Sequence, residues 1–333
     1  MRKRNTLKEM RRNRRRRRII RGIVAVLVLI LLIILARVMI GKTGGNTGTV
    51  SGNATKKHSD DLAKAYYISA DASSNEDKTD TSEESESTSS AYTNERIDNL
   101  ESIDSTAQYY SVGSGETDEN GRPLNAVELQ EKYGSTYPVW FIGEETDTPT
   151  IYLTFTEDYE GGYTEQVLNT LKEKGVTATF FCSKSYMQSN PELVERMLSE
   201  GNALGNAISY RSGGIVSEST DDQAEEIMDN HNYVKENFNY DMHLFRFPAN
   251  VFSEQSLAVV NNCNYKAIFF SYSYNDYDAE NQPDVDNSLQ KAVAALHPGA
   301  IYLFQGYSST SAAILGSFID QAQTAGYQIG VID

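Results

Sequence analysis

The sequence predicts an α/β fold class: a distorted, incomplete (β/α)7 barrel that follows one transmembrane helix and a disordered stalk. Three observations predict this organisation. Strand-like and helix-like segments alternate along the chain after residue 148. An apolar run over residues 19–40 is long enough to span a bilayer. The residues between these two regions are polar and contain few large apolar side chains.

The N-terminal region is strongly basic, although the chain as a whole is acidic. The 333 residues include 30 Lys and Arg, 46 Asp and Glu, and carry a formal net charge of −16. Residues 1–21 nevertheless contain twelve Lys and Arg and one acid, Glu9. The acidic total argues against a nucleic-acid partner, because a basic surface supplies most of the affinity for nucleic acid. The basic cluster is better explained by its position beside an apolar segment.

That apolar segment predicts a transmembrane signal-anchor helix over residues 19–40. Its 22 residues would cover ~33 Å against a hydrocarbon core of ~30 Å, with Arg21 and Arg37 reaching toward the interfaces. A cleaved signal peptide fits less well, because no small-residue cleavage site follows the run. The excess of positive charge before the helix places residues 1–18 in the cytoplasm as a basic tail. We therefore predict a single-pass membrane protein with an extracytoplasmic C-terminal domain.

Residues 41–108 are predicted to form a disordered, acidic, Ser/Thr-rich stalk. Such a composition cannot bury enough apolar surface to offset the entropy lost on folding. A flexible segment of this length has an r.m.s. reach of ~45 Å. The stalk would therefore let the outer domain sample the space beside the membrane.

Residues 109–333 are predicted to form the folded domain. The predicted strands cover residues 151–155, 176–181, 203–207, 244–247, 265–270, 300–304 and 327–332. The predicted helices cover residues 162–174, 190–200, 218–237, a segment from 253, 286–296 and 311–325. Gly175 and Gly201 mark the ends of the first two helices, and Asn190-Pro191 starts the second. Alternation of this kind implies parallel strands joined by right-handed crossovers.

Functional side chains of such barrels lie on the loops that follow the strands. Here those loops cover residues 156–159, 206–211, 248–250, 271–278 and 305–308. Their order and spacing resemble the five motifs of the polysaccharide deacetylase family, carbohydrate esterase family 4, over about residues 140–333. The resemblance is closest to the branch that deacetylates muramic acid in spore peptidoglycan. Matching context includes IYLTF…YEGGYT, LKEKGVTATFF, SNPELVERM, LFRFP and LHPGAIYL.

This resemblance implies hydrolysis of a sugar N-acetyl group, a non-peptide carbon–nitrogen bond. In the family, one Asp and two His hold a divalent metal, typically zinc, a second Asp is the base, and a further His is the acid. Here Thr156 stands at the base position and Glu157 at the metal Asp, while Ala207 and Arg211 replace both metal histidines. Gln305 replaces the acid. We therefore predict a pseudoenzyme with no catalytic residues at these positions and no bound zinc.

Polar and aromatic residues on the same loops remain as candidates for a glycan-binding groove. They are Glu157, Asp158, Tyr159, Asn206, Tyr210, Arg246, Asp276, Tyr277 and Tyr307, with Tyr163, Tyr272 and Tyr274 as further rings. Sugar C–H faces stack on aromatic rings while their hydroxyls bind polar groups. Packing of these tyrosines in the barrel is the alternative. Without a base Asp, Arg246 is expected to pair with Asp276 or Glu157.

Other residues could still rebuild a site. Glu157, Asp158 and Asp276 could form an all-oxygen site for Ca²⁺ or Mg²⁺. The four histidines, His58, His231, His243 and His297, do not end a predicted strand, and His297 is expected to play a hydrogen-bonding role. Cys182 and Cys263 could form a disulfide in an oxidising compartment or act as two buried apolar side chains.

Three functions follow from these residues. The first is a membrane-anchored, inactive deacetylase-like protein that binds cell-wall glycan or peptidoglycan, or acts in assembly of the wall or spore envelope. The second is an active or altered carbohydrate N-deacetylase. The third is a platform for protein partners, which the sequence does not identify, without any glycan.

Overall fold

The computed structural model describes residues 94–113, 115–144, 146–209 and 213–332. The predicted membrane helix, the basic tail and most of the predicted stalk lie outside these residues. Among the helices of the described part, none is long and apolar enough to cross a membrane.

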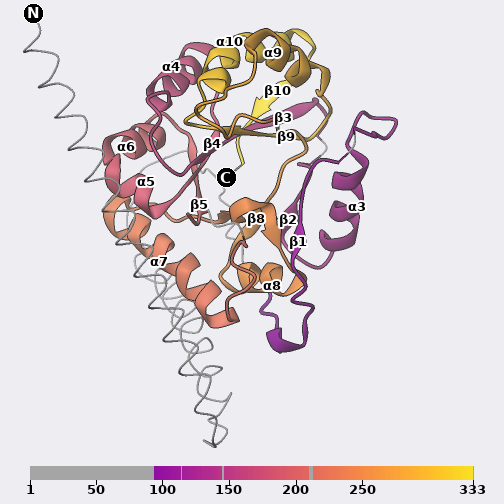
Figure 1. Ribbon diagram of the computed structural model, residues 1–333, viewed down its shortest axis with the longest axis vertical. Coiled ribbons are helices and arrows are strands. Elements are labelled where there is room, and N and C mark those ends of the chain that lie inside the picture. The colour runs from indigo at the N-terminus through magenta and orange to yellow at the C-terminus, as the bar shows by residue number, and fades with distance from the viewer. Residues whose placement is uncertain (1–93, 114, 145, 210–212, 333) are drawn as a thin grey trace, which may run out of the picture. The chain divides into compact units, whose positions relative to one another are not determined.

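A curled parallel sheet forms the centre of this domain (Figure 1). Its strands are β2 (Val139–Trp140), β3 (Thr150–Glu157), β4 (Thr179–Cys182), β5 (Ala203–Ala207), β6 (Leu244–Arg246), β8 (Lys266–Ile268), β9 (Ala300–Gln305) and β10 (Gln328–Gly330). Neighbours run in the order β9-β3-β4-β5-β6-β8-β2, and β10 also pairs with β3. The strand pairings of this sheet in the described chain are parallel, as the alternation of strands and helices predicts.

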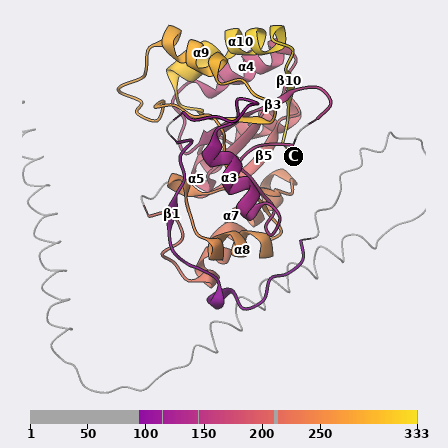
Figure 2. The ribbon, with the colours of Figure 1, turned by 90° about the vertical axis from the view of Figure 1, so that its right-hand side faces the viewer.

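Helices cover the outer face of the curled sheet (Figures 1 and 2). They are α4 (Thr164–Lys174), α6 (Pro191–Ser199), α7 (Thr220–Phe238), α8 (Glu254–Asn262), α9 (Val285–Ala294) and α10 (Ser309–Thr324). The side chains of Ser219, Ser253, Asp284 and Ser308 cap four of them by accepting backbone N–H bonds. All seven predicted strands and all six predicted helices are present, with ends that differ by a few residues.

The last strand, β10, does not take the place at the edge of the sheet that a barrel with its strands in sequence order would give it. Gln328–Gly330 pairs with Thr150–Tyr152, at the beginning of β3, instead of extending the sheet past β9. The sheet approaches closure elsewhere, because the backbone N–H groups of Ser271 and Tyr272 donate to Ile301 O. The fold is therefore a curled half-barrel, which confirms the predicted α/β class and corrects the seven-unit arrangement.

Short elements before and between the main strands were not predicted. They are the helices α3 (Leu124–Tyr133) and α5 (Lys184–Ser189), the 3₁₀ turns η1 (Leu100–Ser102) and η2 (Pro248–Asn250), and the strands β1 (Gln108–Tyr109) and β7 (Val251–Phe252), together with β2. β1 and β7 form an antiparallel pair. Residues 94–108, predicted as the end of the disordered stalk, are instead ordered: residues 94–103 lie along α8, where Asn262 exchanges hydrogen bonds with the backbone of Ile97.

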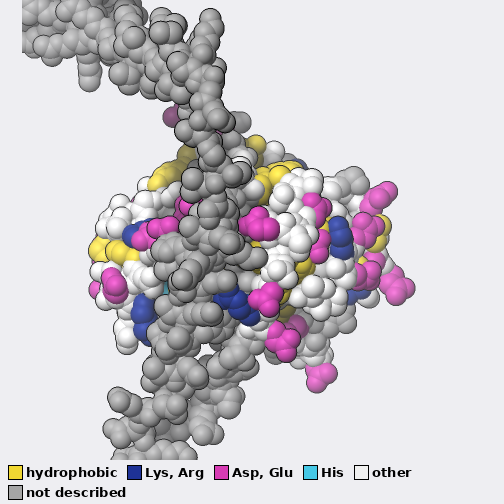
Figure 3. Space-filling model, turned by 90° about the horizontal axis from the view of Figure 1, so that it is seen from below, with side chains coloured by type: hydrophobic (Ala, Val, Ile, Leu, Met, Phe, Trp, Pro, Cys, Tyr) yellow, Lys and Arg dark blue, Asp and Glu magenta, His cyan; other side chains and the backbone are white. Residues whose placement is uncertain are grey.

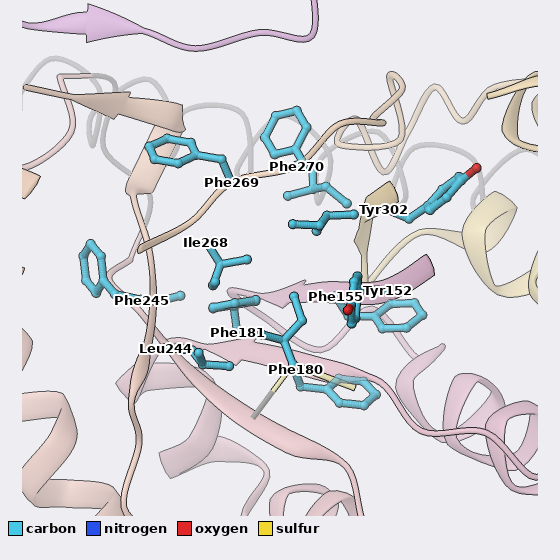
Figure 4. Close-up of a cluster of buried hydrophobic side chains, with 14 of the residues drawn as sticks. Tyr152, Phe155, Phe180, Phe181, Leu244, Phe245, Ile268, Phe269, Phe270 and Tyr302 are labelled. Carbon is cyan, nitrogen blue, oxygen red and sulfur yellow. The ribbon is translucent and has the colours of Figure 1, made fainter. Parts of the chain in front are cut away.

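Buried aromatic side chains pack against both faces of the curled sheet (Figure 4). Tyr110, directly after β1, packs edge-on against Phe141, Phe269 and Phe270, and its hydroxyl donates to the carbonyl of Phe270. Burial of such large rings supplies most of the driving force for folding. The N-terminal segment is thereby fixed to the core next to the carboxyl ends of the strands.

Candidate functional site

A cleft of about 870 Å³ lies at the carboxyl ends of the parallel strands. The loops after β3, β5, β6, β8 and β9 surround it, as expected for this type of fold. Its lining residues are Tyr109, Thr156, Asp158, Tyr159, Ser185, Ala207, Ile208, Ser209, Arg246, Phe247, Pro248, Ala249, Asn250, Val251, Ser273, Tyr274, Asn275, Tyr277, Leu303, Gln305 and Tyr307. Predicted candidates Tyr210 and Arg211 lie outside the described residues.

The register of the sheet decides which motif residues reach this cleft. Directly paired residues of neighbouring strands point to the same face of a sheet. Thr156 pairs with Gln305 on β9, and Ala207 pairs with Arg246 on β6. These four residues form a cleft-facing row, since all four line the cleft. The residues that precede them within the strands, Phe155, Asn206, Phe245 and Phe304, alternate to the opposite face and do not line the cleft.

Arg246 lies at the bottom of the cleft and is only 4% exposed. Its guanidinium donates Nη1–H to Thr156 Oγ1 (3.2 Å), Nη2–H to Thr154 Oγ1 (2.8 Å) and Nε–H to the Ile268 carbonyl (3.5 Å). It also lies 4.0 Å from the centre of the Phe181 ring. Burial lowers the pKa of Arg246 to about 9, so the group remains charged at neutral pH.

The predicted pairing of Arg246 with an acid is wrong. Its hydrogen-bond partners among the described residues are two hydroxyls and a carbonyl, and no carboxylate of the described chain forms an ion pair with it. The physical reason is the register: Glu157 belongs to the opposite face of β3, and Asp276 binds elsewhere.

Glu157 faces the helices and does not line the cleft, which corrects its prediction as a groove residue. It pairs in register with Cys182, and its Oε1 accepts a hydrogen bond from Thr164 on α4 (3.3 Å). Oε2 is buried without a partner. Complete burial, reinforced by nearby Glu160, raises the pKa of Glu157 well above its usual value. The environment of this side chain therefore favours its protonated form.

Asn206 also faces away from the cleft, contrary to its prediction as a groove residue. Its amide donates to the carbonyl of Ile227 on α7 (2.8 Å) and its Oδ1 accepts from Asn230 (2.8 Å). Both asparagines are buried. Asn206 therefore ties β5 to α7, while its neighbour Ala207 reaches the cleft.

Asp276 lies behind the cleft wall and does not line it, which corrects a third predicted groove residue. Its Oδ2 accepts hydrogen bonds from the backbone N–H of Gln305 (2.8 Å) and from the hydroxyl of Ser311 (2.7 Å). Burial raises the pKa of Asp276 to about 7. The role of this side chain is to hold the segment after β9, and with it Gln305, in position.

Asp158 is the single carboxylate among the described cleft-lining residues. It follows the last residue of β3, so the strand alternation no longer controls its direction. Its Oδ1 is buried without a hydrogen-bond partner. Burial raises the pKa of Asp158 to about 6. Because Asp158 lines the cleft and is only partly buried, its carboxylate can accept a hydrogen bond from a ligand hydroxyl.

Exposed tyrosines gather at the edge of the cleft. The large apolar side chains that are exposed in the described chain include three tyrosines, Tyr109 (71%), Tyr159 (46%) and Tyr277 (64%), and all three line the cleft. Tyr159 stacks on Tyr307 with ring centres 4.3 Å apart and planes 19° apart. Exposed rings at one cleft form a platform suited to the faces of sugar rings.

The remaining predicted rings divide between cleft and core. Tyr274 lines the cleft and its hydroxyl hydrogen-bonds Ser311 Oγ (2.6 Å). Tyr163 and Tyr272 pack with the core instead. Both predicted roles of the tyrosines, groove lining and packing, therefore occur.

Comparisons with known proteins agree with this architecture. A sequence model of the family described as polysaccharide deacetylase matches residues 143–268. The peptidoglycan-N-acetylmuramic acid deacetylase PdaA of Bacillus subtilis is 34% identical over 215 residues, which are 64% of this chain and 78% of that protein. The chain belongs to the polysaccharide deacetylase family. The family resemblance carried by the five loop motifs is thereby confirmed.

Solved structures extend the comparison to three dimensions. The structure of Bacillus subtilis PdaA, a family 4 carbohydrate esterase, matches with a TM-score of 0.62 and 28% identity, covering 69% of this chain and 97% of that one. A CE4 family pseudoenzyme from Bacillus anthracis matches with a TM-score of 0.54 and 20% identity, covering 58% and 67%. The second likeness shows the fold alone.

The residues of this polysaccharide deacetylase family member do not fit the family's metal. Among the described residues, no group of three or more His, Cys, Asp or Glu side chains is arranged to hold an ion. The imidazoles of His231 and His297 hydrogen-bond Tyr265 and the Pro298 carbonyl, away from the cleft. The alternative all-oxygen site does not form there either, because Glu157 and Asp276 are outside the cleft.

The cysteines take no part in the site. Cys182 and Cys263 are both buried and free, so the second of the two predicted alternatives, apolar side chains in the interior, describes them. Burial raises the pKa of both thiols above the usual value. Neither is a cleft-lining residue.

Several residues that line the cleft were not predicted from the sequence. Tyr109 comes from the short strand β1, which precedes the strand–helix alternation and carries no recognisable signal. Ala249 and Asn250 lie in the left-handed region with φ of 54° and 56°. Asn is one of the few residues besides Gly that tolerates this conformation. Pro248, which precedes these two residues, was a usable signal for a turn.

Proposed function

We propose that this family member binds cell-wall glycan outside the membrane and does not hydrolyse it by metal-dependent deacetylation. One observation carries the proposal. The cleft combines a platform of exposed tyrosines with Thr156, Ala207 and Gln305 at the positions of the base, a metal ligand and the acid. A threonine hydroxyl cannot act as a base at neutral pH, and no described side chain supplies an imidazole in its place.

Binding would use ordinary contacts for saccharides. The rings of Tyr109, Tyr159 and Tyr277 offer apolar faces to sugar C–H groups, and Asp158 accepts from hydroxyls. A cleft of about 870 Å³ falls within the range of small-molecule sites. The cell-wall assignment is supported by the relative PdaA, a peptidoglycan-N-acetylmuramic acid deacetylase.

The test is acetate release compared with glycan binding by the same purified full-length chain. We expect no acetate from acetylated peptidoglycan, with or without added zinc, and retention of the chain on insoluble peptidoglycan. Bacillus subtilis PdaA is the positive control for acetate release. Zinc-dependent release that a chelator abolishes would restore the active-deacetylase alternative. Failure of the folded chain to bind any glycan would favour the protein platform.

We also propose that residues 19–40 anchor the chain in the membrane with the C-terminal domain outside. The length of the apolar run and the twelve basic residues before it support this proposal. Retention in membranes after alkaline carbonate extraction, together with cleavage of the C-terminal domain by protease added outside intact spheroplasts, is the expected result. Release by carbonate would contradict the anchor.

A further inference from the structure

The guanidinium of Arg246 is a buried charge with spare hydrogen-bond donors. A guanidinium carries five N–H groups. Three of those of Arg246 donate to Thr154, Thr156 and the Ile268 carbonyl. One N–H on each of Nη1 and Nη2 is therefore uncommitted among the described residues. Arg246 also lines the cleft, so ligand can approach it.

Neutral surroundings compensate this charge only in part. A buried ion loses its hydration, and two hydroxyls, one carbonyl and one ring face replace it. The Phe181 ring under the guanidinium is fully buried and packs over Gly205, where a Cβ would lie 2.4 Å from it. The cation is thus held rigidly at the cleft without a counter-charge from the described chain.

Two neighbouring side chains, Thr156 and Gln305, add hydrogen-bond donors beside the guanidinium. Thr154 accepts from Arg246 and gives its own proton to the Tyr302 carbonyl (2.6 Å). Thr156 accepts from Arg246 in the same way, but its own proton has no acceptor among the described residues. Gln305 pairs with Thr156 in register, and its cleft-lining side-chain amide has no hydrogen-bond partner among the described residues. A guanidinium, a hydroxyl and an amide therefore surround one spot.

We propose that the cleft binds a saccharide that carries a free carboxylate, and that this carboxylate lies beside Arg246 where the family has its base Asp. The proposal rests on the proposed glycan-binding function and names the ligand class. Loss of the base carboxylate has left a guanidinium whose planar donors match a carboxylate. The uncommitted proton of Thr156 supplies a further bond. Asp158, the cleft's own carboxylate, is left to accept from hydroxyls of the same ligand.

The charge of the whole domain does not prevent this contact. Residues 109–333 contain 11 Lys and Arg against 32 Asp and Glu, and acidic side chains are spread over the visible part of the surface in Figure 3. Such a field repels anions at long range, but exposed charges are screened over ~8 Å at physiological salt. A contact with a buried guanidinium is screened much less. Raising the salt concentration from 0.05 to 0.3 M is therefore not expected to weaken binding of the acidic saccharide.

The experiment compares two tetrasaccharides by titration calorimetry with the full-length chain. One consists of N-acetylglucosamine alone, and the other alternates N-acetylglucosamine with glucuronic acid. We expect the acidic tetrasaccharide to bind at least tenfold more tightly. Sodium acetate should displace the acidic tetrasaccharide and leave the binding of the neutral one unchanged.

Substitution of Thr156 supplies the decisive variants. Thr156→Asp places a carboxylate of similar volume beside Arg246, so it should remove the preference for the acidic tetrasaccharide and retain the affinity for the neutral one. Thr156→Asn is the matched neutral control and should keep most of the preference. Circular dichroism establishes that both variants are folded. Arg246→Met, where it folds, should lose the preference as Thr156→Asp does.

The outcomes separate the two proposals. Binding of both tetrasaccharides with equal affinity overturns the carboxylate proposal and leaves glycan binding standing. Binding of neither by the folded chain overturns glycan binding itself. Retention of the preference in Thr156→Asp also overturns the proposal, because the guanidinium would then not be the group that recognises the carboxylate. The carboxylate proposal is also overturned if acetate binds but the chain shows no preference between the two tetrasaccharides.

Discussion

The two faces of the same parallel strands differ in what they carry. The cleft-facing row, with Thr156, Ala207, Arg246 and Gln305, holds one charge and no acid. The helix-facing row, one residue away in sequence, holds Phe155, the buried acid Glu157 and the buried amide Asn206. The family's motif positions are spread over both rows. A motif match therefore identifies the neighbourhood of a site, and the strand register decides which of its residues face ligand.

This comparison implies that the helix-facing row determines stability and the cleft-facing row determines binding. The largest loss of stability is expected for a substitution of Phe155. Phe155 is fully buried and stacks on Phe180 with ring centres 5.1 Å apart. Phe155→Ala should lower the free energy of unfolding by about 3–5 kcal/mol through lost burial and a residual cavity. Chemical denaturation measures the change.

Its sequence neighbour is the matched control. Thr156→Ala removes a cleft-facing hydroxyl that accepts one bond from Arg246, and it should cost about 1 kcal/mol or less, since water can replace the hydroxyl in an open cleft. Equal losses in the two variants would show that the two faces do not divide the roles in this way.

A smaller loss of stability is expected at Gly205, where the cleft-facing side of the sheet is tightly packed. A Cβ added at Gly205 would lie 2.4 Å from the Phe181 ring, which the guanidinium of Arg246 covers from another side. Gly205→Ala should therefore destabilise the domain by about 1–3 kcal/mol through overpacking. Thermal unfolding is the measurement, and Phe181→Leu in the same chain should recover part of the loss.

Gly213 provides the control for this substitution. No atom lies within 4 Å of a Cβ at that position, and its φ is outside the left-handed region. Gly213→Ala should leave the melting temperature nearly unchanged. If Gly205→Ala behaved in the same way, Phe181 would have room to move and would not hold Arg246 rigidly.

Buried acids on the helix side predict a pH dependence of stability. The pKa of Asp276 is raised to about 7 and that of Glu157 lies well above its usual value, both because of burial. Between about pH 4, where unfolded carboxyls titrate, and about pH 7, the folded domain binds more protons than the unfolded chain. The stability that protonated Asp276 contributes is therefore complete at low pH and is lost as the pH rises through 7, and Glu157 contributes with the same sign.

Denaturation at pH 5 and pH 8 tests this sign. The free energy of unfolding should fall toward pH 8, by an amount on the order of 1–3 kcal/mol. Glu157→Gln should make the decline shallower, because the amide has no proton to lose. Glu280→Gln, at an exposed position, removes the same charge without burial and should leave the slope unchanged. A steeper decline in Glu157→Gln would contradict the assignment of the buried acid.

The sequence was informative wherever a local pattern determines structure. Strand composition, glycine stops and helix caps predicted every main strand and helix, because these signals depend on neighbouring residues. The face of the sheet toward which each side chain points at a strand end was harder to predict. Successive side chains of a strand point to opposite faces of the sheet. This rule could have placed Glu157 opposite to Thr156 and Asn206 opposite to Ala207, if it had first been decided which residues of each strand face the cleft. Tyr109 could not have been found, because the pairing of β1 with β7 and the tertiary packing of Tyr110, both of them contacts between distant residues, bring β1 to the cleft.

The smallest expected effect concerns the exposed edge of the cleft, where neither row of the sheet contributes. Tyr159 is 46% exposed and is held against Tyr307 at 4.3 Å, so its ring is oriented before any ligand arrives. Such a ring loses little freedom on binding a sugar, and a stacking contact of this kind contributes about 0.5–1.5 kcal/mol. Tyr159→Ala should therefore weaken binding of both tetrasaccharides about three- to tenfold, without changing the preference between them. Tyr327→Ala is the control, since Tyr327 precedes β10 and does not line the cleft. A Tyr159→Ala chain that lost only the acidic ligand would place the carboxylate at the tyrosine platform and not beside Arg246.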